Sequence, residues 1–295
     1  MDMPGAGVHL GLTYLLGKSF RIRAMYLLLL GSILPDVARF SQVFFDMFFC
    51  TFNDSIIECY LISFHAFFMM LLLAAVIGLL TSNPWRTGII VFLSAAFHLI
   101  LDLTEIDIGN KLPAFYPFSF REISLGWFDP DGTLLLSAAV IFTAVFVFSL
   151  FDDFAEPISL SKKRILPASI VLITALILPA ITLHKMLDLN ISSLGFIVNP
   201  EKYENKVIEI NRSPVIKTDP LTVDESGVVM ELTTDQKFKK GDWLSFRGIY
   251  SKGKVTVLEM ETHTGRTKIW FSLPALIMFL FITVRLVVRI RGHNT

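Results

Sequence analysis

Five ionisable side chains lie within or at the ends of long apolar runs, where a charge is costly unless it serves a purpose. They are His9, Asp36, His65, His98 and Asp102. His98 and Asp102 are four residues apart and share one helix face, which suits two ligands of one metal or a ligand with its orienting carboxylate. Three imidazoles and two carboxylates are enough for one catalytic metal with an open water position, and could serve two. Together the residues predict a shared metal or proton-handling site, although each alone would be read as a packing histidine or an interfacial carboxylate.

Glu105 and Asp107 follow the His98 and Asp102 pair and could add oxygen ligands. Cys50 and Cys59 have no metal-ligand spacing, so they are read as unpaired thiols or as one bridge on an oxidising side. The first residues lack the basic and apolar regions of a secretory signal peptide, and we expect the N-terminus to be retained.

The elements that must position these residues are apolar. The chain is 53% hydrophobic with a mean hydropathy of +0.61, more than the core of a soluble protein needs. Its formal net charge of +0 gives no indication of a polyanionic partner. A membrane crossing takes about 20 apolar residues. The sequence therefore predicts a mainly α, polytopic transmembrane helix bundle with five long spans, preceded by two shorter apolar helices, 5–17 and 24–36. The long spans are 56–81, 85–103, 132–151, 164–184 and 269–290.

Basic residues predict the orientation. Arg86 begins one span, Lys162, Lys163 and Arg164 begin another, and Arg285 lies near the end of the last, so these ends are expected to be cytoplasmic. The five candidate ligands, the loop 103–131 and the segment 185–268 then lie on the outer side. The C-terminus is expected inside the cell.

The segment 185–268 changes period, with short β-type runs separated by turn residues. It predicts a small all-β domain, inserted before the last span and similar in pattern to an OB-fold barrel. Basic and acidic residues nearly balance there, so nucleic acid is an unlikely partner, and that role would require the domain to face the cytoplasm. Trp243, Phe246 and Tyr250 could form a stacking platform, but alternating strand aromatics are more often core residues. The predicted domains are thus 1–184, 185–268 and 269–295.

Residues 5–130 resemble a known family, the inner-membrane-associated metal-dependent hydrolases, also described as LexA-binding or LexA-regulated membrane hydrolases. The resemblance rests on four pieces in the family's order: His9 with Gly11, LGSILPD, SFHAFF, and FHLILDLTEIDIGNKLPAFYPFSFREISLG. It implies His9, Asp36, His65, His98 and Asp102 as site residues. The chain departs from the family pattern at four positions that are usually polar: Ala38, Tyr60, Leu61 and Ala66. Nothing in these residues supports binding of a cytoplasmic repressor.

The resemblance implies a hydrolase, and the residues agree with a divalent metal, with zinc favoured, acting on an ester or phosphoester. The histidines would be ligands, and Asp36 and Asp102 would be ligands or, one of them, the general base. A site in the outer leaflet favours a membrane lipid or lipid-linked substrate. The loop 112–131 would lie at the membrane interface and cover the site with its aromatic residues Phe115, Tyr116, Phe118, Trp127 and Phe128. The alternative is a non-catalytic membrane protein whose polar cluster is structural or ion-conducting and whose β domain binds a protein partner.

Overall fold

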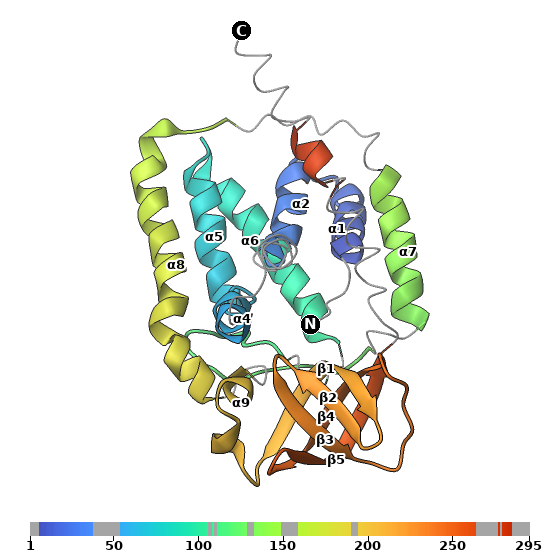
Figure 1. The fold of residues 1–295 in the computed structure, drawn as a ribbon. Coiled ribbons are helices and arrows are strands. Elements are labelled where there is room, and N and C mark those ends of the chain that lie inside the picture. The colour runs from blue at the N-terminus through green and yellow to red at the C-terminus, as the bar shows by residue number, and fades with distance from the viewer. Residues whose placement is uncertain are drawn as a thin grey trace.

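A helical bundle and a β-barrel lie end to end in the computed structural model of the chain (Figure 1). The structure describes residues 6–37, 54–105, 108, 111–128, 133–148, 159–189, 194–263, 277 and 279–284. The α-helices of this part are α1 (Ala6–Ser19), α2 (Met25–Ile33), α4 (Asp54–Ile62), α5 (Phe67–Leu79), α6 (Pro84–Leu103), α7 (Thr133–Phe148), α8 (Ile165–Asp188) and α9 (Leu194–Val198). Two 3-10 turns, η2 (Lys162–Arg164) and η4 (Pro200–Tyr203), precede α8 and the barrel.

Helix α6 is the central element of the bundle. It begins at a standard N-terminus, where the Asn83 side chain accepts a hydrogen bond from the Arg86 N–H and Pro84 occupies the first helical position. Helix α2 approaches α6 closely at Gly31, where an added Cβ would lie 2.4 Å from the Val91 carbonyl oxygen. This contact sets the spacing between the two helices, because α2 and α6 can be this close only while position 31 has no side chain.

The predicted five-span bundle is wrong. Within the described residues, only Pro84–Leu103 and Lys162–Asp188, of 20 and 27 residues, are long and apolar enough to cross a membrane. The expected span 56–81 is interrupted between α4 and α5, where Ala66 is extended with φ −123° and ψ 143°. Helix α5 has 13 residues and the described part of α7 has 16, both fewer than the roughly 20 residues of a typical crossing. The average hydropathy of a run does not reveal whether its helix is continuous, and here the break carries His65.

Most of the expected last span, 269–290, lies outside the described residues. The described part of it, residues 277 and 279–284, is helical. The two shorter N-terminal helices are present as α1 and α2. Cys59 is buried in α4, and Cys50 lies outside the described residues.

Five strands form a closed barrel with the order β1-β2-β3-β5-β4, and β4 pairs back with β1. They are β1 (Val207–Thr218), β2 (Leu221–Glu225), β3 (Val228–Thr233), β4 (Trp243–Ser251) and β5 (Lys254–His263). All pairs are antiparallel except β3 with β5. A small barrel was predicted here, and β2 is the strand that the sequence reading missed. Phe246 and Tyr250 are buried in the barrel core, as expected of strand aromatics, so they do not offer a stacking face.

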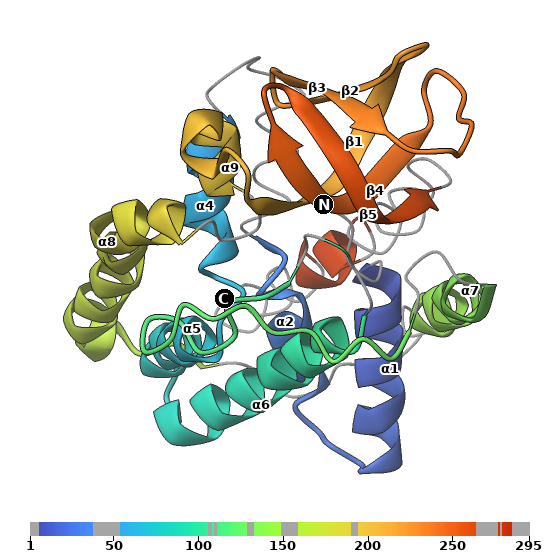
Figure 2. The ribbon, with the colours of Figure 1, turned by 90° about the horizontal axis from the view of Figure 1, so that it is seen from below.

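The barrel lies against one end of the bundle, close to α9 and α4 (Figure 2). Phe196 of α9 belongs to the barrel core and lies edge-on to Tyr250, with ring centroids 4.9 Å apart. Leu194 of the same helix belongs to the bundle core. Lys111, just after α6, places its Nζ 2.8 Å from an oxygen of Glu209 on β1. These contacts fix the barrel at the C-terminal end of α6.

Candidate metal centre

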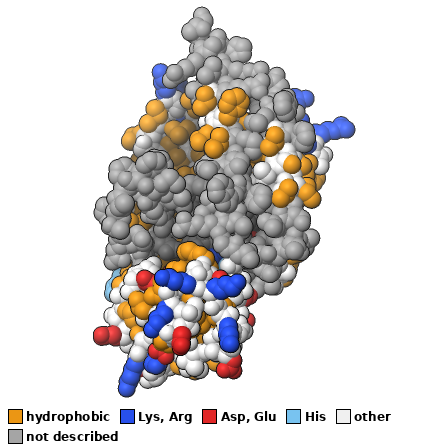
Figure 3. Space-filling view, turned by 45° about the vertical axis from the view of Figure 1, so that its right-hand side comes forward, with side chains coloured by type: hydrophobic (Ala, Val, Ile, Leu, Met, Phe, Trp, Pro, Cys, Tyr) orange, Lys and Arg blue, Asp and Glu red, His pale blue; other side chains and the backbone are white. Residues whose placement is uncertain are grey.

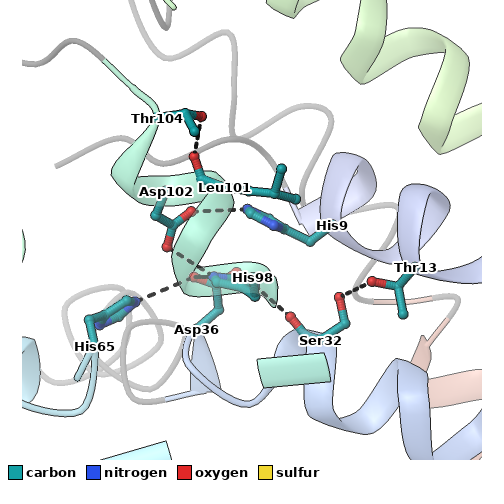
Figure 4. Close-up of polar contacts among 9 residues, drawn as sticks. All are labelled: His9, Thr13, Ser32, Asp36, His65, His98, Leu101, Asp102 and Thr104. Carbon is teal, nitrogen blue, oxygen red and sulfur yellow. Dashed lines mark hydrogen bonds and ion pairs between the residues drawn. The ribbon is translucent and has the colours of Figure 1, made fainter. Parts of the chain in front are cut away.

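The five candidate ligands meet at the barrel end of the bundle and come from four separate elements (Figure 4). His9 lies in the first turn of α1, Asp36 in the turn after α2, His65 in the break between α4 and α5, and His98 and Asp102 in the last turns of α6. All five are buried, with residue exposures of 7% or less. A buried set of ionisable groups must be paired, protonated or bound to a cation, because isolated charges are too costly in such surroundings.

Two carboxylates lie among the three imidazoles. Asp102 places one oxygen 3.2 Å from His9 Nε2 and the other 3.1 Å from His98 Nε2. Asp36 places Oδ1 3.7 Å from His65 Nε2 and 3.8 Å from His98 Nε2. The His9 and His98 rings are stacked, with centroids 3.7 Å apart. His98 is therefore the residue that joins the two halves of the cluster.

A backbone carbonyl fixes the orientation of His98. Its Nδ1 lies 2.6 Å from the carbonyl oxygen of Ser32. A carbonyl can only accept a hydrogen bond, so Nδ1 carries the proton, and in a neutral ring Nε2 then presents a lone pair. A backbone carbonyl on the second ring nitrogen is a common partner of a metal-binding histidine. Thr13 donates to the Ser32 side chain at 3.0 Å, which ties α1 to this part of α2.

The lone pair of His98 Nε2 points toward acceptor oxygens. Among the described residues, His98 Nε2 and both Asp102 carboxylate oxygens are buried without a hydrogen-bond partner of acceptable geometry. With the His98 proton on Nδ1, the contact between His98 Nε2 and Asp102 is therefore repulsive unless a proton or a metal ion lies between the two atoms. The bridging group is either a metal ion or a proton carried by the imidazole or by the carboxyl.

The buried His and Asp groups could hold a metal ion. Two sets of three have ligand atoms within 4.8 Å of one another, namely His9, His98 and Asp102, and Asp36, His65 and His98. Both sets need His98, whose Nδ1 is already bonded to Ser32. One nitrogen binds one metal, so His98 can serve as a ligand in only one of the two sets at a time.

The two further candidate oxygen ligands, Glu105 and Asp107, are not part of either set. Glu105 is buried just beyond α6, where its backbone pairs with Phe128 and its carbonyl accepts a hydrogen bond from Ser124, and it belongs to neither set. Asp107 lies outside the described residues.

The sequence analysis did not predict the roles of Ser32 and Thr13 at the site. Thr13 could have been found from its spacing, since it lies four residues after His9 on the same face of α1.

One of the departures from the hydrolase pattern, Tyr60, has a structural role in this chain. The Tyr60 hydroxyl donates to the Leu176 carbonyl at 2.7 Å and so joins α4 to α8. Pro179, inside α8, removes one backbone N–H from the same region of the helix. Ala66 is fully buried at the start of α5, and Ala38 lies outside the described residues. Tyr60 thus supports the bundle where the family pattern has a polar site residue.

The segment 111–128 covers this end of the bundle. The Ala114 carbonyl accepts the Phe67 N–H at 3.0 Å, next to the break that holds His65. The prediction that the aromatic residues of this loop lie at an interface is wrong for Tyr116, which is fully buried and has its hydroxyl 2.6 Å from Thr182 Oγ1. Phe118 and Trp127 are exposed, at 79% and 65%. One side of the segment is therefore built into the bundle and the other faces outward.

Comparisons with protein-family models, with curated proteins and with solved structures found no match. The resemblance to the inner-membrane hydrolases therefore stays a prediction that rests on the residues quoted for it.

Proposed function

We propose that this protein is a membrane-embedded, divalent-metal-dependent hydrolase that acts on an ester or phosphoester bond of a membrane lipid or lipid-linked substrate. The observation that carries the proposal is the orientation of His98. Its Nδ1 is held by the Ser32 carbonyl and its Nε2 faces two carboxylates at 3.1 and 3.8 Å, with two further imidazoles in the same cluster. The resemblance of residues 5–130 to the membrane hydrolases supports the same activity.

The surface of α8 supports a membrane location. Its large apolar side chains are exposed along the helix, with Leu166 and Ile181 each at 73% and Ile170 at 58%. An apolar surface of this extent would be unfavourable in water and is typical of a lipid-facing helix. We place the protein in the cell membrane as a multi-pass protein, with Arg86 and the start of α8 inside and the metal site, covering segment and barrel outside. Protease treatment of intact cells should then cut the barrel.

The chain's own residues would share the work of hydrolysis. When bound, a divalent cation, with zinc favoured by the mixed nitrogen and oxygen donors, supplies Lewis-acid polarisation of the substrate and lowers the pKa of a water molecule. His9, His98 and Asp102 would hold it on one side, and Asp36 and His65 lie on the other. A carboxylate oxygen of Asp36, or of Asp102, would take the proton from the attacking water and later return it to the leaving oxygen as the ester bond breaks. The buried surroundings would exclude other water.

The test is metal content together with hydrolysis by the purified, detergent-solubilised chain. We expect about one transition-metal ion per chain, measured by mass spectrometry of the elements, and cleavage of chromogenic ester or phosphoester substrates with lipid-like tails. His98→Ala should lose both. His184→Ala is the matched control, because the His184 side chain is 88% exposed near the end of α8 and far from the cluster in sequence. A His98→Ala protein that keeps its metal and its activity would contradict the proposal.

The alternative, a non-catalytic protein whose cluster is structural or conducts ions, is favoured by the contacts at 3.1 and 3.2 Å around Asp102. These are also the distances of histidine–carboxylate ion pairs, in which protons replace the metal. Wild-type protein purified without chelators and free of transition metal would support this alternative. In that case Asp102→Asn should alter proton or cation flux into vesicles instead of substrate cleavage.

A further inference from the structure

The end of the bundle far from the barrel is strongly basic. Three stretches of the described chain form it: 18–24 between α1 and α2, 80–87 between α5 and α6, and 159–166 at the start of α8. They contain no Asp or Glu, and their basic residues are Lys18, Arg21, Arg23, Arg86, Lys162, Lys163 and Arg164. In Figure 3, Lys and Arg side chains lie at this end beside hydrophobic ones, and the Asp and Glu side chains in view lie on the barrel together with further Lys and Arg.

Hydrogen bonds join two of these stretches. Thr81 and Leu160 form a β-bridge, and the Ser82 N–H donates to the Ser159 carbonyl at 2.8 Å. The guanidinium of Arg164 donates to the Thr81 carbonyl at 2.9 Å, so part of its charge serves to hold the loops together. The bonding brings the exposed side chains of Lys162 and Lys163 to the start of α6, where Arg86 is also exposed.

The third stretch, 18–24, lies at the same end of the bundle. Ile22, between Lys18 and α2, packs in one apolar cluster with Ile77 near the end of α5 and Ile90 in the second turn of α6. The basic residues of the α1–α2 turn therefore lie on the same end as those around α8. They form one charged surface drawn from three loops, which we call the basic end.

Large apolar side chains are interleaved with these charges and point outward. Phe20 is 73% exposed, Trp85 80%, Leu160 70% and Leu166 73%. A surface for a soluble acidic partner would not need four such residues. Basic side chains next to exposed aromatic and aliphatic ones are typical of a bilayer interface, where the apolar groups enter the acyl region and the cations meet headgroup phosphates.

We infer that the basic end binds the headgroups of anionic phospholipids. The first argument is charge complementarity between the basic residues and anionic headgroups. The second is continuity of the basic end with the proposed lipid-facing surface, because Leu166 belongs both to the basic end and to the exposed apolar face of α8. Clusters of Lys and Arg beside a membrane-crossing helix bind anionic lipids electrostatically. The inference rests on the proposed membrane location and goes beyond the hydrolase activity, since the basic end lies at the opposite end of the bundle from the metal site.

The experiment titrates the full-length, detergent-solubilised protein with phosphatidylglycerol, phosphatidylcholine or inorganic phosphate, and follows retained lipid by native mass spectrometry and thermal stability by fluorimetry. We expect retention and stabilisation with phosphatidylglycerol, and little effect of phosphatidylcholine or free phosphate. The triple variant R86Q/K162Q/K163Q leaves Arg164 in place to hold the loops. Each basic residue near an anionic surface changes affinity by a factor of about five, so phosphatidylglycerol should bind on the order of 100-fold more weakly.

The matched control is K237Q/K239Q/K240Q, which removes three exposed charges from the loop between β3 and β4 and should bind like wild type. Equal binding of the two phospholipids, or equal loss in both triple variants, would overturn the inference. An acidic stretch of the same chain, with Asp152, Asp153 and Glu156, is the competing occupant. If phosphatidylglycerol binds to the D152N/D153N/E156Q variant but not to wild type, the acidic stretch is the occupant of the basic end and the inference fails.

Metal content distinguishes a failure of the lipid-binding inference from a failure of the proposed hydrolase function. R86Q/K162Q/K163Q should keep the wild-type amount of metal while losing lipid preference. His98→Ala should lose its metal while keeping the wild-type preference for phosphatidylglycerol.

Discussion

Replacing Gly31 with alanine should disturb the metal site without touching any candidate ligand. A Cβ at this position would lie 2.4 Å from the Val91 carbonyl oxygen and 2.8 Å from Ser94 Cβ, both on α6. Neither the backbone atom nor a helical Cβ can move aside alone. Helix α2 must therefore move away from α6, and it carries with it the Ser32 carbonyl that orients His98.

The size of the movement follows from the contact. An ordinary Cβ contact is about 3.4 Å or longer, so the helices must separate by about 1 Å. The bond from His98 Nδ1 to the Ser32 carbonyl, 2.6 Å long, could then lengthen to about 3.6 Å, beyond hydrogen-bonding distance. Loss of such a supporting partner weakens metal binding by about 10- to 100-fold. Overpacking should cost about 1–3 kcal/mol of stability, partly offset by about 1 kcal/mol of helix propensity.

The assay is metal affinity by competition with a chelator of known strength, alongside thermal unfolding. The matched control is Gly88→Ala in α6, where an added Cβ would have its nearest neighbour, the Ala74 carbonyl oxygen, at an ordinary 3.4 Å. That variant should keep wild-type metal affinity. If Gly31→Ala is destabilised but binds metal as tightly as wild type, the carbonyl does not position His98 and the reasoning is refuted.

Three further outcomes can be checked separately. Asp102→Asn should lower the metal content at least as far as Gly31→Ala does, measured on the same purified samples, because it removes a charge from between two imidazoles. Tyr60→Phe should cost about 1 kcal/mol in thermal unfolding by removing the bond to the Leu176 carbonyl, and retained metal would confirm that this residue is structural. Hydrogen bonds from the Lys252 N–H and the Ser251 hydroxyl hold the pKa of Glu204 below its usual range. This carboxylate therefore stabilises the barrel above about pH 4.3, its unfolded pKa, and the contribution is lost as pH falls through the lower folded pKa, so Glu204→Gln should flatten the acid limb of a pH–stability curve.

The sequence alone identified the candidate site because polar residues are conspicuous in apolar runs. His9, Asp36, His65, His98 and Asp102 were named from composition, spacing and the hydrolase resemblance, and the structure places them in one buried cluster. The barrel was equally readable, since alternating short runs between turn residues have a period that helices do not show. Both are local signals, which is why they can be read without the tertiary structure.

The tertiary structure decided what local signals do not contain. An apolar run from 56 to 81 looks like one span, but the chain breaks it at Ala66, and the neighbouring His65 reaches the site from that break. Strand β2 is only five residues long, and it is identified by its pairing with β1 and β3. Tyr116 looks like an interfacial aromatic, but a hydroxyl partner on α8 allows it to be fully buried.

The use of His98 as a ligand was also restricted by the tertiary structure. Two carboxylates and three imidazoles permit one metal or two from the sequence alone. The carbonyl of Ser32 leaves His98 a single nitrogen for the cluster, and both ligand sets depend on it. A backbone carbonyl has no sequence signature, so this restriction appears only when α2 and α6 pack together at Gly31.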